Sequence, residues 1–312
     1  MPLFDTCDRE TPPRAANRDG GGPTRSCMGV SGTLPPLTQL FPCEFAATTG
    51  LKSPSLRIFR FKDGACLMKT LVLIPARLAA TRLPGKPLAD IGGVAMIVRV
   101  WRQAMAAGVG RVAVAAGDAD IVAAVVAAGG EAVMTDPDLP SGSDRIHAAL
   151  HALDPQGAVE AVINLQGDMP FVSTEAILAC AERLQASPCD IATVVAREQA
   201  IADRTNPDVV KAILSLDPGG TAGRCLYFTR STLYGDGPIW RHVGLYGYRR
   251  EALRRFTEAK PSPLELREKL EQLRALELGL RIDAAVISDA PLSVDTEADL
   301  DAARREAEKR RL

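Results

Sequence analysis

From residue 68 onward, short apolar runs alternate with stretches in which apolar residues recur every three or four positions. Unbroken apolar runs of strand length are typical of a sheet that is covered on both faces. The three-to-four spacing is typical of amphipathic helices. Because the two patterns alternate along the chain, they predict βαβ units. We therefore expect an α/β fold that is Rossmann-like, with a mixed, mostly parallel sheet flanked by helices.

The expected elements follow from these patterns and from capping residues. Strands are predicted at 70–75, 111–117, 131–135, 190–196, 209–215, 241–248 and 281–287, and at 161–170, where a strand runs into a polar loop. Helices are predicted at 96–105, 120–130, 141–153, 174–186, 263–279 and 294–311. Serines can cap the third of these helices, and either Asp295 or Thr296 can cap the last one.

The first 67 residues show neither pattern. They hold eight of the 22 prolines and a glycine run at 20–22. Such a composition is typical of disordered segments. We expect residues 1–67 to form a disordered extension and residues 68–312 to form the catalytic domain. A second interpretation is that Met68 is the natural start of the chain.

Composition narrows the class of protein further. A net charge of -1 with 24% charged residues argues against a nucleic-acid-binding protein, so any basic site must be local. No apolar run approaches the roughly 18 residues of a membrane helix, and no membrane insertion is expected. Seven cysteines without a CxxC pair indicate free thiols in a reducing compartment. These features favour a cytoplasmic protein.

Polar clusters follow several of the predicted strands, where the ligand site of an open α/β sheet lies. They comprise Arg77, Arg82 and Lys86, then the serine-rich segment 141–145, then Gln166 and Asp168, and finally Asp295. The sequence "LPGKPL" lacks the first glycine of a P-loop, and no GxGxxG motif is present there. Cations, amides and carboxylates together predict a phosphate ester with its metal. A solvated basic loop is the alternative.

Several segments resemble one enzyme family in order and spacing. They are "LIPARLAATRLPGKPL", "GGEAVMTDPDLPSGSDRI", "VINLQGDMP", "DRTNPDVVK", "RHVGLYGYRREAL", "PSPLELREKLEQLRALELG" and "SVDTEADL". The family is that of the 3-deoxy-manno-octulosonate cytidylyltransferases, also called CMP-Kdo synthetases. The resemblance covers residues 68–312, and several blocks together are far more specific than one motif.

The resemblance implies a fold, a reaction and an assembly. The fold is that of the nucleotide-diphospho-sugar transferases. The reaction joins CTP and 3-deoxy-D-manno-octulosonate (Kdo) to give CMP-Kdo and pyrophosphate, with Mg²⁺ as cofactor, and it activates Kdo for lipopolysaccharide biosynthesis. The segment around 210–260 resembles the family's dimerisation region, so a homodimer is expected.

The resemblance also assigns roles to individual residues. The catalytic residues would be Arg77, Lys86 and Asp168. Nucleotide binding would involve Ala76, Arg77, Lys86, Ser141, Gly142 and Arg145. Binding of the sugar acid would involve Arg82, Gln166, His242, Tyr246, Glu271 and Gln272, and the metal ligands would be Asp168 and Asp295.

One departure from the family concerns the loop after the second predicted strand. Relatives often carry a Thr-Asp pair where this chain has Ala116 and Gly117, with Asp118 following. This departure motivates one alternative, a nucleotide-binding homologue without catalytic activity. The other alternative is a cytidylyltransferase of the CMP-sialic acid synthetase type, which also uses an α-keto acid sugar.

Overall fold

A computed structural model describes residues 68–79, 82–198 and 201–310, all within one compact unit, Pro54–Leu312. The expectation of disorder at 1–67 lies outside the described residues. The strands are β1 (Thr70–Ala76), β2 (Arg111–Ala116), β3 (Glu131–Met134), β4 (Ala161–Leu165), β5 (Ile191–Glu198), β6 (Lys211–Leu216), β7 (Ala222–Thr229), β8 (Ile239–Arg249) and β9 (Ile282–Ile287). The helices are α1 (Met96–Ala107), α2 (Ala119–Ala127), α3 (Gly142–Leu153), α4 (Thr174–Ala186), α5 (Ile201–Thr205), α6 (Arg250–Glu258), α7 (Pro263–Glu268), α8 (Gln272–Glu277) and α9 (Glu297–Lys309), with a 3₁₀ turn η1 (Lys86–Leu88).

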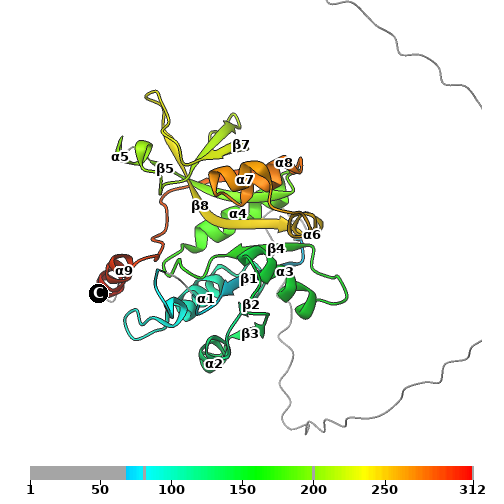
Figure 1. Ribbon diagram of the computed structural model, residues 1–312, viewed down its shortest axis with the longest axis vertical. Coiled ribbons are helices and arrows are strands. Elements are labelled where there is room, and N and C mark those ends of the chain that lie inside the picture. Colours follow the sequence, from blue (N-terminus) through cyan, green and yellow to red (C-terminus); the bar gives the residue numbers. More distant parts are fainter. Residues whose placement is uncertain (1–67, 80–81, 199–200, 311–312) are drawn as a thin grey trace, which may run out of the picture. The chain divides into compact units, whose positions relative to one another are not determined.

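The described strands form one sheet in the order β3-β2-β1-β4-β8-β5-β9-β7-β6. Figure 1 shows the run from β3 to β8. Strands β3, β2, β1 and β4 pair in parallel, as do β5 and β9. Strand β8 is antiparallel to β4, β5 and β6, and β7 is antiparallel to β6 and β9. Only β7 and β8 therefore run against the common direction of the described strands. The prediction of a mixed sheet is confirmed, but its pairings are not mostly parallel, because five of the nine pairings between the described strands are antiparallel.

Helices cover both faces of the sheet, as the unbroken apolar strands require. On one face, Val72 and Ile74 of β1 pack in a core with apolar residues of α1, α2 and α4. On the other face, Leu71 and Leu73 pack with residues of α3, α6 and α8. Because alternate residues of a strand point to opposite faces, β1 contributes to both cores. The carboxyl ends of β1 and β4 are thereby held at one edge of the sheet.

Helix α9 packs elsewhere. Its Leu300, Ala303 and Ala307 form a separate core with Leu83 and Ile91 of the loop between β1 and α1. Thr296 caps this helix by accepting a hydrogen bond from the Asp299 amide, with Asp299 returning the contact in a capping box. Of the two predicted caps, Thr296 is therefore the one used. Asp295 is left available for another contact.

The predicted helix at 263–279 is wrong as a single element. The chain forms α7, breaks at Lys269 and resumes as α8. Lys269 has φ of 56°, the left-handed region that a residue with a side chain rarely adopts. Three further elements, β7, α5 and α6, and the 3₁₀ turn η1 had not been predicted. Among the described residues, no helix combines the length and the apolar character needed to cross a membrane.

Candidate active site

A cavity of about 300 Å³ lies at the carboxyl ends of β1 and β4 and at the start of α3. It gathers eight of the residues that the sequence singled out, namely Ala76, Arg77, Lys86, Ser141, Gly142, Arg145, Gln166 and Asp168. These residues come from four separate segments of the chain. The fold thus brings the predicted cationic loop, the serine-rich segment and the polar loop after β4 to one place.

The loop after β1 is closed on itself by backbone contacts. Exposed Arg77 follows the strand directly, and the amide of Leu78 donates a hydrogen bond of 2.7 Å to Oδ2 of Asp118. The amide of Gly85 donates to the carbonyl of Leu78 at 3.2 Å. Gly85 has φ of 70°, which glycine adopts without steric cost, and it turns the chain into η1. This turn returns Lys86 to the edge of the sheet.

Lys86 joins the two predicted metal ligands. Its Nζ lies 3.1 Å from Oδ2 of Asp168 and 3.1 Å from Oδ1 of Asp295. Nη2 of Arg82 lies 3.3 Å from the same Asp295 oxygen. The two carboxylates, 127 positions apart in the chain, therefore converge on one point.

The partly buried Asp168 carboxyl lies between groups that shift its pKa in opposite directions. Burial raises the pKa of Asp168, the Lys86 ammonium lowers it, and the Asp295 carboxylate raises it again. A second cation near Asp168 would favour its charged form. The cluster is therefore suited to receive positive charge.

The start of α3 forms another wall of the cavity. Oγ of Ser141 accepts a hydrogen bond of 3.1 Å from the Asp144 amide and donates one of 2.7 Å to Oδ2 of Asp144. A Cβ on Gly142 would lie 3.4 Å from Cγ of Pro75 and 3.8 Å from Nε2 of Gln166. These are ordinary van der Waals distances, so Gly142 lies directly against β1 and Gln166.

Arg145 is buried behind this wall and braces the neighbouring loop. Its guanidinium donates to Oγ1 of Thr135 at 2.6 Å, to the carbonyl of Asp136 at 2.9 Å and to that of Pro137 at 3.1 Å. Burial, and after it Arg77, lower the pKa of Arg145. A Cβ on Gly117 would lie 2.8 Å from its Nη1. The departure at position 117 therefore leaves room for the guanidinium.

The predicted sugar-acid residues lie beside this cavity. His242 and Tyr246 are on β8, with ring centroids 5.3 Å apart. Glu271 precedes α8, and buried Gln272 begins it. Gln166 lines the cavity and also lies next to β8, because a Cβ on Gly244 of β8 would be 3.5 Å from its Cγ. The site therefore has two adjoining parts.

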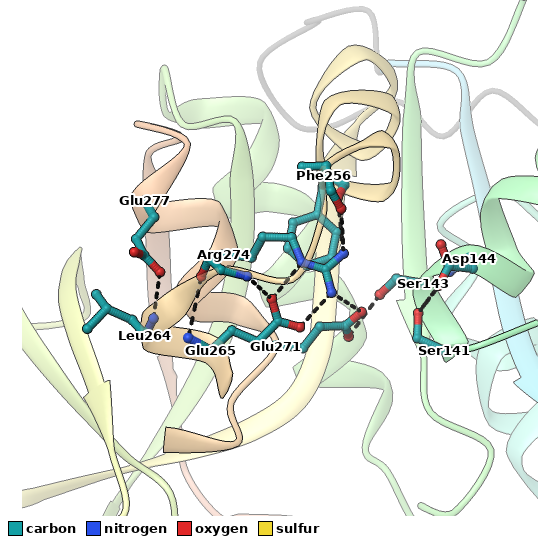
Figure 2. Close-up of polar contacts among 11 residues, drawn as sticks. Ser141, Ser143, Asp144, Phe256, Leu264, Glu265, Glu271, Arg274 and Glu277 are labelled. Atoms are coloured by element: carbon teal, nitrogen blue, oxygen red, sulfur yellow. Dashed lines mark hydrogen bonds and ion pairs between the residues drawn. The ribbon is translucent and has the colours of Figure 1, made fainter. Parts of the chain in front are cut away.

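Glu271 connects the two parts (Figure 2). Oγ of Ser143, in the first turn of α3, donates to Oε2 of Glu271 at 3.2 Å. Oε1 of Glu271 is buried without a hydrogen-bond partner among the described residues. Burial raises the pKa of Glu271, and the Ser141 hydroxyl, the Arg274 cation and the Ser143 hydroxyl oppose this rise. A buried acceptor without a hydrogen bond is costly, so this oxygen is suited to accept a hydrogen bond from a hydroxyl of a ligand.

Arg274 holds the turn that carries Glu271 (Figure 2). Its Nε and Nη2 donate to both carboxylate oxygens of Glu265, at 2.7 and 2.5 Å. The guanidinium carbon lies 4.7 Å from the ring centroid of Phe256, and Nη2 lies 3.8 Å from Oε1 of Glu271. This buried ion pair closes the segment across the break at Lys269.

Three contributors to the site were missed from the sequence. They are Asp118, which braces the loop after Arg77, Arg274, and Thr193 of β5, which contacts His242. Signals exist for two of them, since Thr193 and Arg274 are polar residues inside otherwise apolar patterns. Asp118 offers no such signal, because an aspartate before a helix is an ordinary cap.

Comparison with known proteins identifies the family. A family model described as Cytidylyltransferase matches residues 71–282. A 3-deoxy-manno-octulosonate cytidylyltransferase of Parvibaculum lavamentivorans is 57% identical over 235 residues, which are 75% of this chain and 91% of the relative. One of Rhodopseudomonas palustris is 59% identical over 237 residues, 76% of this chain and 96% of the relative.

A solved structure gives the same result. It is the structure of CMP:2-keto-3-deoxy-manno-octonic acid synthetase complexed with CTP, and it is 33% identical with a TM-score of 0.72. The match covers 78% of this chain and 99% of that one. With its fold, its cavity at the strand ends and these relatives, the chain belongs to the 3-deoxy-manno-octulosonate cytidylyltransferase family of nucleotidyltransferases.

Proposed function

We propose that the protein transfers CMP from CTP to the anomeric hydroxyl of Kdo, giving CMP-Kdo and pyrophosphate, and so activates Kdo for lipopolysaccharide biosynthesis. The observation that carries the proposal is the cavity in which Arg77, Lys86 and Asp168 meet the start of α3. Membership of the family and the names of the relatives support it.

The reaction needs positioning and neutralised charge. The anomeric oxygen bonds to the α-phosphorus, the bond from that phosphorus to the β-phosphate oxygen breaks, and the hydroxyl proton is released. Arg77 and Lys86, with the backbone of Ala76, would neutralise the triphosphate and the leaving pyrophosphate. Ser141 and Gly142 would read the cytosine edge, with Arg145 holding that wall in place.

The residues present fit Mg²⁺. Asp168 and Asp295 converge within 3.1 Å of one point, the Lys86 ammonium, and provide hard oxygen ligands. Magnesium commonly takes one or two carboxylates, with phosphates and water completing its coordination. Among the described residues, no cluster of three or more acidic, His or Cys side chains offers a fuller cage. When bound, the ion would polarise the phosphate oxygens.

The sugar acid would lie against the second part of the site. Gln166, His242, Tyr246, Glu271 and Gln272 offer a set of polar side chains close to the cavity, with Arg82 beside the phosphates. Oε1 of Glu271, which is buried and has no hydrogen bond among the described residues, supports a role in binding a polyol. Several fixed hydrogen-bond partners suit such a ligand.

Assembly and location are also part of the proposal. A homodimer is supported by the exposed apolar residues Leu216, Leu226 and Tyr234, which fall within the segment 210–260. The cytoplasm is supported by the buried free thiols of Cys180, Cys189 and Cys225, the cysteines in the part of the chain that the structure describes. Sedimentation of the purified protein tests the dimer.

The two alternatives are not favoured. The curated relatives compared above are named for the Kdo reaction rather than for sialic acid. The inactive homologue was suggested by the altered loop at Ala116 and Gly117. This loop is nevertheless well fitted to the site, because Gly117 leaves room for Arg145 and Asp118 accepts a hydrogen bond from the loop after β1.

A pyrophosphate-release assay tests the proposal. CTP, UTP, ATP and GTP are each combined with Kdo or sialic acid, with and without Mg²⁺. Release is expected only with CTP, Kdo and Mg²⁺ together, and the product is checked by mass spectrometry. Comparable rates with sialic acid would support the rival enzyme, whereas CTP binding without release would support the inactive homologue.

A further inference from the structure

The hydroxyl of Thr193 lies at the meeting point of three acceptors or potential acceptors. Thr193 is fully buried on β5, and its Oγ1 lies 2.9 Å from the carbonyl oxygen of Leu245 and 3.3 Å from that of Val243. Oγ1 also lies 3.1 Å from Nε2 of His242. A hydroxyl has one proton to donate, so it cannot serve all three.

The irregular pairing of β5 with β8 creates this arrangement. Thr193 pairs with Tyr246, whereas the next residue, Val194, pairs with Val243. Two residues of β8, Gly244 and Leu245, are therefore bulged. A bulge disrupts the regular ladder, and here the carbonyls on either side of Gly244 lie within reach of the threonine hydroxyl.

The hydroxyl proton is best placed on the Leu245 carbonyl. If it went to Nε2 instead, the hydroxyl oxygen and the carbonyl oxygen would face each other at 2.9 Å with no proton between them. Buried acceptors in such contact are unfavourable. With the proton on the carbonyl side, Oγ1 must accept a hydrogen bond from the ring, and Nε2 must carry the ring proton.

We propose that Thr193 is a positioning residue that holds His242 in the tautomer protonated on Nε2, so that Nδ1 is presented as an acceptor to a hydroxyl of the sugar acid. The identity of the ligand rests on the proposed function, whereas the tautomer does not. In a neutral imidazole the nitrogen without the proton is a hydrogen-bond acceptor. Nδ1 of His242 has no hydrogen-bond partner among the described residues.

The rest of the environment fixes the ring and keeps it neutral. The backbone amide of His242 donates to the carbonyl of Val210 at 2.9 Å. The rings of Phe228 and Tyr246 lie 5.1 and 5.3 Å from the imidazole, measured between centroids. Burial lowers the pKa of His242 to about 3. A neutral Nδ1 without a proton can accept a hydrogen bond from a hydroxyl of the ligand. It cannot bind a carboxylate, which has no proton to donate.

The tautomer can be read without substrate. The chain has three histidines, so nitrogen NMR of protein labelled at histidine gives few signals, and loss of one pair in His242→Gln assigns them. The expected spectrum of His242 has a protonated Nε2 and an unprotonated Nδ1. A wild-type ring protonated on Nδ1, or on both nitrogens at pH 7, would overturn the proposal.

Variants of Thr193 test its role. Thr193→Val keeps the shape and removes the hydroxyl, and it should give mixed tautomers and an affinity for Kdo about tenfold weaker, with CTP affinity within about twofold. Thr193→Ser keeps the hydroxyl and should restore both readouts. An unchanged tautomer in the valine variant refutes the assignment. Should that variant not fold, the wild-type spectrum and Thr193→Ala still decide.

The outcome also separates this inference from the proposed function. If His242 shows the expected tautomer and Thr193→Val alters it, Thr193 has the role assigned here. If the same wild-type protein then neither binds Kdo nor releases pyrophosphate with it, the proposed function fails, and the ligand named for Nδ1 fails with it.

Discussion

The two parts of the site hold their charges in different ways. We call the cavity with the Lys86, Asp168 and Asp295 cluster the nucleotide part, and the region around Glu271 the sugar-acid part. In the nucleotide part, Asp295 is 41% exposed, and it meets the 69% exposed side chain of Arg82, a predicted sugar-acid residue, at 3.3 Å. In the sugar-acid part, Arg274 and Glu265 are 8% and 12% exposed and form two short hydrogen bonds. The first contacts can exchange for a ligand, whereas the second are part of the folded core.

Because of this difference, the charged residues of one part should matter for function and those of the other for stability. Charges that pair loosely near solvent contribute little to the free energy of folding. A buried pair that loses one partner leaves an uncompensated charge, which is strongly destabilising. Substitutions in the nucleotide part should therefore reduce turnover, and substitutions beneath the sugar-acid part should reduce stability.

The largest effect is expected from Asp168→Asn. It removes a proposed magnesium ligand while keeping the size of the side chain, so kcat should fall by about 100-fold or more. The melting temperature should not fall. The raised pKa of this carboxyl means that the fold disfavours its charged form, so a neutral amide of the same size costs no stability. Asp301→Asn, on the exposed face of α9, is the matched control. Turnover within threefold of the wild type would remove Asp168 from the mechanism.

Arg274→Met should act on stability instead. It leaves Glu265 buried without its cation, and the free energy of unfolding should fall by about 3–5 kcal/mol, measured by urea denaturation. Arg254→Met is the control, because Arg254 pairs with Glu251 and Glu258 on the exposed face of α6 and its loss should be too small to resolve. Equal losses for both arginines would contradict the distinction between the two parts.

Gly117→Ala tests the wall behind the nucleotide part. Its Cβ would lie 2.8 Å from Nη1 of Arg145 and 3.3 Å from Cβ of Arg77, so one of these side chains must shift. Overpacking of this kind costs about 1–3 kcal/mol. The affinity for CTP, measured by calorimetry, should weaken by about tenfold. Gly237→Ala, where no atom lies within 4 Å of the new Cβ, should leave it unchanged.

A smaller effect concerns the pH dependence of stability. The pKa of His242 is lowered to about 3 in the folded protein, against about 6.5 when unfolded. Between these values the unfolded chain binds a proton that the folded one does not. The free energy of unfolding therefore falls as the pH drops below about 6.5.

His242→Gln should abolish that contribution, so the loss of stability between pH 7 and pH 5 should shrink by roughly 1–2 kcal/mol. His147, whose pKa is also lowered by burial, remains in both proteins and cancels in the comparison. Identical pH profiles from urea denaturation would show that the imidazole is not held neutral by the fold.

All of the described strands except β7, and most of the helices, could be predicted from the sequence because their apolar periods are strong and local. The break at Lys269 could not, because the leucines at 264, 266, 270, 273 and 276 continue the helical pattern through it. The turn is fixed by contacts of the folded chain, the capping box at Ser262 and the pair between Arg274 and Glu265. Helix α6 was missed because most of its residues are charged and only Ala252, Leu253 and Phe256 are buried, too few to give a clear apolar period.

In the site too, features that are local in the sequence could be predicted, and those fixed by distant contacts could not. The residues that line the cavity follow strand ends, so topology alone predicts where they meet. Asp118 and Thr193 act through backbone groups 40 and about 50 positions away, at Leu78 and at Val243 and Leu245. Thr193 stands out as a polar residue in an apolar run, but the partners of both residues are distant in the sequence and follow from no local pattern.

The bulge in β8 also restricts how this strand can change during evolution. Its extra residues, Gly244 and Leu245, come as a pair, and successive residues of a strand point to opposite faces. His242 and Tyr246 therefore remain on the same face of the sheet. Loss of a single residue between them would turn one ring to the opposite face. Length variants at this point should survive selection only when they add or remove an even number of residues.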